Sequence, residues 1–198
     1  MSDLSRNSEP TAPADGDIWV FGYGSLMWRP GFSYRAAEPA LLRGYHRAFC
    51  IRSVRYRGTP ERPGLVVGLD RGGSCRGRAY RVAAADARAA LDYLDTRELV
   101  TGVYTRRVVP VHVRAGRVEA YTYVADRGHA QYAGKLAPGR AADIILAGHG
   151  ASGDNRDYLE NIVAHLDELG IPDGPLHTLL RLVSERRRPG IREHGPSG

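Results

Sequence analysis

Strand-like segments fill the first two-thirds of this chain and helix-like segments fill most of the rest, an order that restricts the folds it can adopt. Short apolar runs bounded by glycine-containing turns predict strands at 17–21, 40–51, 64–69, 74–82, 103–113 and 117–125, with turns at 70–73 and 114–116. Segments rich in alanine and leucine predict helices at 83–98, 140–146, 155–169 and 176–187. Strands first and helices later, with one helix inserted, predict an α+β fold with a mostly antiparallel sheet or barrel and flanking helices.

One folded domain is expected over residues 17–184, because no linker divides two cores and the chain of 198 residues has the size of one large domain. Residues 1–16 lack apolar periodicity and predict a disordered N-terminal tail. Residues 185–198 include three consecutive arginines before Pro189 and predict a basic C-terminal tail.

Composition excludes several classes of protein. The net charge of +6 comes almost entirely from arginine, since Lys135 is the only lysine, and the arginines are scattered rather than gathered in a stripe. This distribution argues against nucleic-acid binding and suits the capture of an anionic small molecule. No apolar run reaches the length of about 20 residues that crosses a bilayer, and no secretory signal is visible, so neither membrane insertion nor secretion is expected. Two isolated cysteines fit a cytoplasmic location.

A glycine-containing segment, residues 22–26, directly follows the first predicted strand. Gly22 and Gly24 let the backbone approach a ligand and permit positive φ, and exposed amides in such a turn can bind an anion or a developing oxyanion. The segment lacks the third glycine of a dinucleotide-binding motif, the Gly-Lys of a phosphate loop and the second glycine of a nucleophile elbow. An ordinary strand-ending turn is the alternative interpretation.

A glutamate at the end of the 83–98 helix is the candidate general base. At 100° per residue, Glu98 shares one face with Leu91 and Leu94, which directs it toward the apolar core. Burial and the negative end of the helix dipole both disfavour a carboxylate and should raise its pKa toward neutrality. The alternative is a surface glutamate paired with Arg97 or Arg106.

Other kinds of chemistry have little support. Asp95 lies about 60° from Glu98 on the helix and is the second candidate acid. The seven histidines show no metal-ligand spacing, so no metal and no cofactor are expected. Cys50 and Cys75 are interpreted as small core residues rather than nucleophiles.

Several blocks, in the same order along the chain, together resemble the ChaC family, the glutathione-specific γ-glutamylcyclotransferases. They are VFGYGSLMW at 20–28, RGYHRAF at 43–49, RGTPE at 57–61, PGLV at 63–66, GSCRGRAY at 73–80, RE at 97–98, YAG at 132–134 and SGDN at 152–155. The resemblance covers roughly residues 18–183. The family commonly has Tyr-Leu-Gly where this chain has Tyr132-Ala133-Gly134.

The resemblance implies a γ-glutamylcyclotransferase fold and a reaction that needs no cofactor. Glutathione would cyclise to 5-oxoproline and release Cys-Gly, with Glu98 as the catalytic acid and base. The implied substrate-binding residues are Val20, Phe21, Gly22, Tyr23, Gly24, Ser25, Leu26 and Tyr132. Two alternatives stay open: a cyclotransferase for other γ-glutamyl amines or dipeptides, and a non-catalytic small-molecule-binding regulator.

Overall fold

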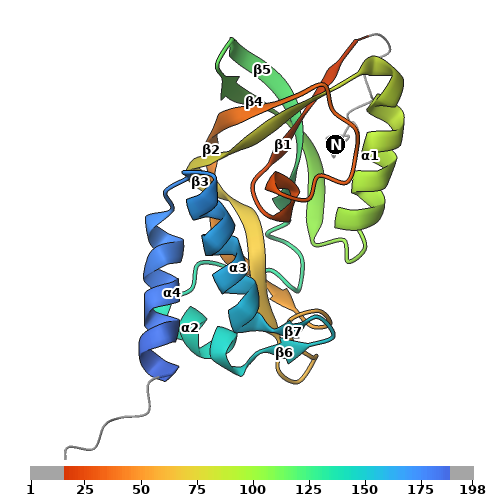
Figure 1. Cartoon of the computed structure of the whole chain (residues 1–198). Coiled ribbons are helices and arrows are strands. Elements are labelled where there is room, and N and C mark those ends of the chain that lie inside the picture. Colours follow the sequence, from red (N-terminus) through yellow and green to blue (C-terminus); the bar gives the residue numbers. More distant parts are fainter. Residues whose placement is uncertain (1–15, 188–198) are drawn as a thin grey trace, which may run out of the picture. The chain divides into compact units, whose positions relative to one another are not determined.

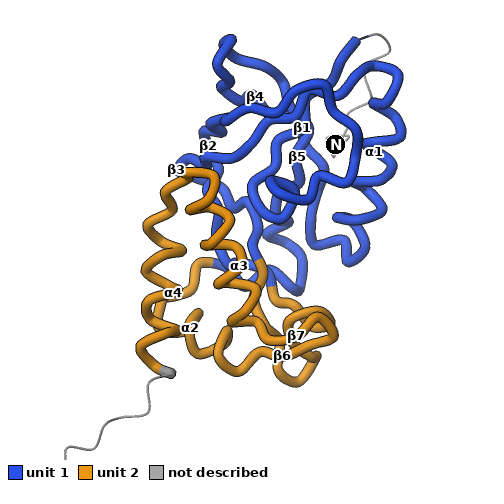
Figure 2. The backbone as a smooth tube through the Cα atoms, in the orientation of Figure 1, with its two compact units in different colours: residues 1–51, 67–134 blue, residues 52–66, 135–198 orange. Residues whose placement is uncertain are grey.

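The computed structural model describes residues 16–187, which divide into two compact units (Figure 2). Of the described residues, unit 1 takes 16–51 and 67–134, and unit 2 takes 52–66 and 135–187. The predicted N-terminal tail, apart from residue 16, and residues 188–198 of the predicted C-terminal tail lie outside the described residues. A single folded domain over 17–184 stays a prediction.

A closed barrel of five strands forms the main element of unit 1 (Figure 1). The strands are β1 (Ile18–Gly22), β2 (Ala36–Ser53), β3 (Gly64–Val82), β4 (Tyr104–Val113) and β5 (Gly116–Ala125). They follow one another around the barrel in the order β1-β3-β2-β4-β5. The pairs β1–β3, β2–β4 and β4–β5 are antiparallel, and a short parallel pairing of β1 with β5 completes the barrel. The predicted α+β fold with a mostly antiparallel barrel is confirmed.

Strand β3 corrects one prediction. The expected turn at 70–73 does not separate two strands, because β3 runs without interruption from Gly64 to Val82. Gly72 and Gly73 have φ of +98° and +69°, a conformation that glycine adopts with little strain. The glycine pair therefore changes the local direction of one long strand, whereas the sequence pattern suggested a chain reversal.

One apolar cluster of unit 1 lies between β1, β3, β5 and one helix, α1 (Ala84–Glu98). Leu91 and Leu94 of α1 are buried with Val20, Tyr80 and Tyr123 in one apolar cluster. Asp17 lies ahead of β1 and accepts a hydrogen bond from the first amide of α1, at 3.2 Å, where no residue of the helix itself provides a side-chain cap. This packing fixes the rotation of α1 and so decides where the end of the helix presents Glu98.

Unit 2 contains the three predicted C-terminal helices, α2 (Pro138–Ala147), α3 (Asn155–Glu168) and α4 (Gly174–Arg187). A two-stranded sheet of β6 (His149–Gly150) and β7 (Gly153–Asp154) precedes α3. The fully buried Asn155 pairs with both backbone groups of Leu65, each at 2.6 Å. Of the described helices, none has the length and apolar character to cross a membrane.

Candidate active site

The glycine loop (residues 22–26) leaves the barrel at the end of β1 and enters a short 3-10 helix, η1 (Ser25–Met27). A Cβ on Gly22 would lie only 3.1 Å from the Cβ of Leu26, so a larger residue would require a small local shift of Leu26. Neither Gly22 nor Gly24 has positive φ, so the expected use of positive φ does not explain why glycine occurs at these two positions. Close packing favours glycine at position 22, whereas a Cβ on Gly24 would have no heavy atom within 4 Å and would point into open space.

The amino end of η1 has unused hydrogen-bond donors. No side chain caps it, and the amides of Met27 and Arg29 are satisfied within the turn by the carbonyls of Gly24 and Ser25, at 2.9 and 2.8 Å. In the part of the chain that the structure describes, the amides of Gly24, Ser25 and Leu26 donate to no protein acceptor. Such amides at a helix start attract an anion or a developing oxyanion.

Two residues that the sequence analysis did not single out hold this loop in place. The buried Arg47 of β2 donates from Nε to the carbonyl of Tyr23 at 2.5 Å and from Nη2 to the carbonyl of Arg76 at 2.6 Å. Burial raises the pKa of Tyr80 to about 12, and its hydroxyl lies 2.9 and 2.7 Å from the carbonyls of Leu26 and Met27. The available sequence signal was an arginine within a predicted apolar strand. Arg47 lies in the segment RGYHRAF, which resembles the family, but no role was predicted for it.

Glu98 lies at the end of α1 on the face that the helical periodicity predicted, below the buried Leu91 and Leu94. Its side chain is 20% exposed. Burial raises the pKa of Glu98 above that of an ordinary glutamate, and the charge of Arg97 acts in the opposite direction without cancelling the effect. The Glu98 carboxyl is therefore mostly buried, and its pKa is shifted in the direction that favours proton uptake.

The guanidinium of Arg97 links Glu98 to the glycine loop. Its Nε lies 3.1 Å from Glu98 Oε1, and its Nη2 donates to the Ser25 hydroxyl oxygen at 2.6 Å. Its Nη1 donates to the backbone carbonyl of Arg29 at 2.9 Å. The alternative interpretation named Arg97 correctly as the ion-pair partner of Glu98, although the Glu98 side chain is largely rather than fully withdrawn from solvent.

Asp95, the second candidate acid, is occupied on both oxygens. It accepts from the Tyr123 hydroxyl at 2.7 Å and from Arg106 at 2.5 Å. Burial, the hydrogen bond to Asp95 and the negative charges of Asp95 and Glu98 all raise the pKa of Tyr123, so this hydroxyl keeps its proton as a donor. Asp95 therefore connects the end of α1 to β4 and β5 through these two contacts.

Tyr132 belongs to a separate polar cluster of unit 1. Its hydroxyl donates to the buried Asp70 at 2.9 Å, and Arg127 binds the other Asp70 oxygen at 2.7 Å. Burial disfavours the Asp70 charge, but the hydrogen bonds from Arg127 and Tyr132 outweigh it and lower the Asp70 pKa. Among the described residues, no hydrogen bond or ion pair joins Tyr132 to Glu98 or to the glycine loop.

Val20 and Phe21 have no exposed surface, and Val20 lies in the core cluster of unit 1. Thr122 donates to the Phe21 carbonyl at 3.0 Å, which ties the end of β1 to β5. These two residues support the loop through packing and backbone pairing, and their role in substrate binding stays a prediction.

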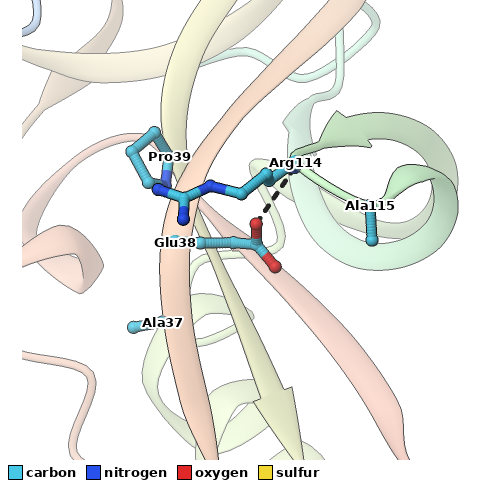
Figure 3. Close-up of a pocket in the computed structure, with 5 residues that line it drawn as sticks. All are labelled: Ala37, Glu38, Pro39, Arg114 and Ala115. Atoms are coloured by element: carbon cyan, nitrogen blue, oxygen red, sulfur yellow. Dashed lines mark hydrogen bonds between the residues drawn. The ribbon is translucent and has the colours of Figure 1, made fainter.

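Other features of the described chain stand apart from this region. Within residues 16–187 no group of three or more His, Cys, Asp or Glu side chains could hold a metal ion. Cys50 and Cys75 are buried and unbridged, and burial raises the pKa of Cys50 to about 12, which disfavours a thiolate. A surface pocket near the β4–β5 turn is lined by Ala37, Glu38, Pro39, Arg114 and Ala115, with Glu38 accepting from the Arg114 amide at 3.0 Å (Figure 3). It contains none of the predicted site residues.

Solved structures identify the class of fold. A yeast γ-glutamylcyclotransferase specific to glutathione superposes with a TM-score of 0.78 and 25% identity, covering 88% of this chain and 98% of that one. A second solved structure, named γ-glutamyl cyclotransferase, has a TM-score of 0.51 and 16% identity, covering 82% of this chain and 86% of that one. The barrel is therefore a γ-glutamylcyclotransferase fold.

The family follows from sequence comparison. A family model described as ChaC-like protein matches residues 18–186, and the chain belongs to this family. A glutathione-specific γ-glutamylcyclotransferase of Escherichia coli is 35% identical over 188 residues, which cover 92% of this chain and 81% of the relative. Glutathione-specific γ-glutamylcyclotransferase 1 of Homo sapiens is 39% identical, covering 73% of this chain and 69% of the relative. The predicted resemblance is confirmed.

Burial of Glu98 predicts a gain in stability when its charge is removed. The folded state binds the Glu98 proton more tightly than the unfolded state does, because the folded pKa is raised. The resulting loss of stability develops as the pH rises from the unfolded pKa, about 4.3, through the folded pKa, and persists above it. Glu98→Gln should therefore unfold at higher urea concentration than the wild type at about pH 8, with a smaller difference near pH 4. Glu119→Gln, at an exposed position on β5, is the control, and a less stable Glu98→Gln protein at pH 8 would contradict the prediction.

Proposed function

We propose that this chain is a glutathione-specific γ-glutamylcyclotransferase that works without a cofactor. Support comes from its family and from relatives of that name over most of its length. The observation that carries the proposal is the link between Glu98, with its raised pKa, and Ser25 of the glycine loop through one guanidinium. A pure binding protein would not need a carboxyl tuned to accept a proton.

The reaction is an internal aminolysis. The α-amino nitrogen of the γ-glutamyl group attacks the γ-amide carbonyl carbon, and the bond from that carbon to the cysteinyl nitrogen breaks. The products are 5-oxoproline, in which the attacking nitrogen is part of the ring, and Cys-Gly. No water enters. Since both reacting groups belong to one molecule, holding it in the bent conformation supplies much of the acceleration.

Glu98 is the proton carrier in this proposal. Its carboxylate takes a proton from the α-ammonium group, which frees the nitrogen lone pair for attack. Ring closure releases a second proton from the attacking nitrogen, which becomes the N–H of 5-oxoproline. Glu98 passes one of the two protons to the departing cysteinyl nitrogen so that the C–N bond breaks, and the other converts the released Cys-Gly amine to an ammonium group, which restores the Glu98 carboxylate. One carboxyl serves as base and then as acid, which requires a pKa between those of an ordinary glutamate and an amine. The raised pKa of Glu98 has the required direction.

The glycine loop is proposed to bind the glutamyl part of the substrate. The amides of Gly24, Ser25 and Leu26 are available to offset negative charge on the tetrahedral oxygen, and one such donor is typically worth about 3 kcal/mol. Tyr132 is the proposed further substrate contact. The Tyr132 hydroxyl donates its hydrogen bond to Asp70. Its oxygen can therefore only accept a hydrogen bond from a ligand, which suits an ammonium group or an amide N–H.

Ser25 is not a nucleophile in this scheme. Its hydroxyl contacts the Arg97 guanidinium, which cannot take up a proton as a general base would.

The cytoplasm is the proposed location, supported by two unbridged cysteines.

The substrate assay tests this proposal directly. The purified chain is incubated separately with glutathione and with γ-glutamyl-alanine, and 5-oxoproline is measured in both. We expect release from glutathione, little from the dipeptide, and no loss of activity after exhaustive treatment with a chelator. Preferential cleavage of γ-glutamyl-alanine would support the broader cyclotransferase instead. Glutathione binding without any 5-oxoproline would support a non-catalytic regulator and overturn the enzyme proposal.

A further inference from the structure

One arginine connects the two halves of the candidate site. On an α-helix, adjacent side chains point in different directions, so Arg97 and Glu98 would not ordinarily meet. Here the Arg97 side chain turns back so that its Nε lies 3.1 Å from the Glu98 carboxyl. The cation is 25% exposed and the carboxyl 20% exposed. A pair this sheltered holds a more defined geometry than one on an open surface.

Each nitrogen of this guanidinium has a partner on a different segment. Nε faces Glu98, Nη2 donates to the Ser25 hydroxyl at 2.6 Å, and Nη1 donates to the Arg29 carbonyl at 2.9 Å. Nη1 also lies 3.4 Å from the Tyr93 hydroxyl, one turn earlier on α1. A planar guanidinium with three occupied nitrogens holds the end of α1 next to Ser25 of η1 and next to Arg29, two residues beyond η1.

The contact also decides which way the Ser25 hydroxyl points. A guanidinium can only donate, so Ser25 Oγ is the acceptor of this hydrogen bond. The serine hydrogen is consequently directed away from Arg97 and can be donated to an acceptor on a bound molecule, such as a carboxylate or carbonyl oxygen. Arg97 thereby sets the donor direction on the loop while it holds the carboxyl on the helix.

We propose that Arg97 is a positioning residue that fixes the Glu98 carboxyl and the Ser25 hydroxyl as one unit through a single guanidinium. The inference rests on the proposed function. It assigns Arg97 no contact with the substrate. Its effect on the charge of Glu98 follows from the same geometry, since a nearby cation favours the carboxylate.

Two substitutions separate charge from geometry. Arg97→Gln removes both, so kcat for 5-oxoproline release should fall about 10- to 100-fold and the acid limb of the pH profile should move to higher pH. Arg97→Lys retains a cation beside Glu98, but its single nitrogen cannot reach three acceptors spaced around a planar guanidinium, so kcat should fall while the acid limb stays near its wild-type position. Arg88→Gln is the matched control on α1, because its side chain is 88% exposed, and we expect wild-type kcat and pH profile.

A double-mutant cycle with Ser25→Ala tests the link itself. If Arg97 acts partly through Ser25, the combined loss in Ser25→Ala/Arg97→Gln should be smaller than the product of the two single losses. If Arg97→Gln does not fold, the same cycle with Arg97→Lys decides the question. Wild-type kcat and an unshifted acid limb in Arg97→Gln, or losses that simply multiply, would overturn the inference while leaving the proposed function intact. Absence of wild-type activity on glutathione would instead overturn the proposed function.

Discussion

Replacing Glu98 with glutamine is expected to lower kcat for 5-oxoproline release from glutathione by about 10²- to 10⁴-fold. The amide has nearly the shape of the carboxyl but cannot accept the α-ammonium proton or return one to the departing nitrogen. The barrel should be unaffected, because Glu98 lies at the last position of α1 and outside the apolar cluster that buries Leu91 and Leu94.

Steady-state kinetics with glutathione, together with calorimetric binding of glutathione, measures this effect. Binding within a few-fold of wild type alongside the loss of kcat would assign Glu98 to the chemical step. Glu119→Gln is the matched control, since it makes the same change on an exposed side chain of the same unit. Undiminished kcat in Glu98→Gln would refute the mechanism.

The second large effect concerns stability. Arg47→Met should lower the free energy of unfolding by about 2–4 kcal/mol, because it leaves the carbonyls of Tyr23 and Arg76 without their charged donor. Methionine is comparable in length and apolar, so the change removes hydrogen bonds more than it removes volume. Since Tyr23 lies in the glycine loop, KM for glutathione should rise as well.

Urea unfolding of Arg47→Met at neutral pH, followed by circular dichroism, tests this expectation. Arg117→Met is the control, because Arg117 is 64% exposed on β5 and its ion pair with Glu119 spans 3.5 Å. Surface pairs of this kind contribute little to stability. A change within about 0.5 kcal/mol of wild type in Arg47→Met would contradict the role given to Arg47.

Local patterns were sufficient for several features of the site. The 3.6-residue period placed Glu98 on the same face as Leu91 and Leu94, and the order of strands and helices predicted the α+β barrel. Periodicity made Glu98 a candidate general base, but its role in cyclising glutathione and the substrate-binding role of Tyr132 came from the resemblance to a family. Periodicity and composition alone left an ordinary turn and a surface glutamate as open alternatives.

The failures arose where one segment depends on another that is distant in sequence. Gly72 and Gly73 have the composition of a turn, but they lie within one continuous strand, because pairing with other strands decides whether the chain reverses. Gly22 was expected to permit positive φ, but the structure does not use that freedom and instead places the Gly22 backbone close to Leu26.

The amino-acid pattern determined the elements and the rotation of Glu98 on its helix, because side-chain direction within a helix or strand follows from a fixed local repeat. The contacts of Arg97 with Ser25, Arg47 with Tyr23 and Tyr132 with Asp70 span 72, 24 and 62 residues along the chain. No local repeat encodes which polar side chain meets which backbone or hydroxyl group across such separations. Closing the barrel brings these groups together, and the need to satisfy buried polar atoms then selects the partners.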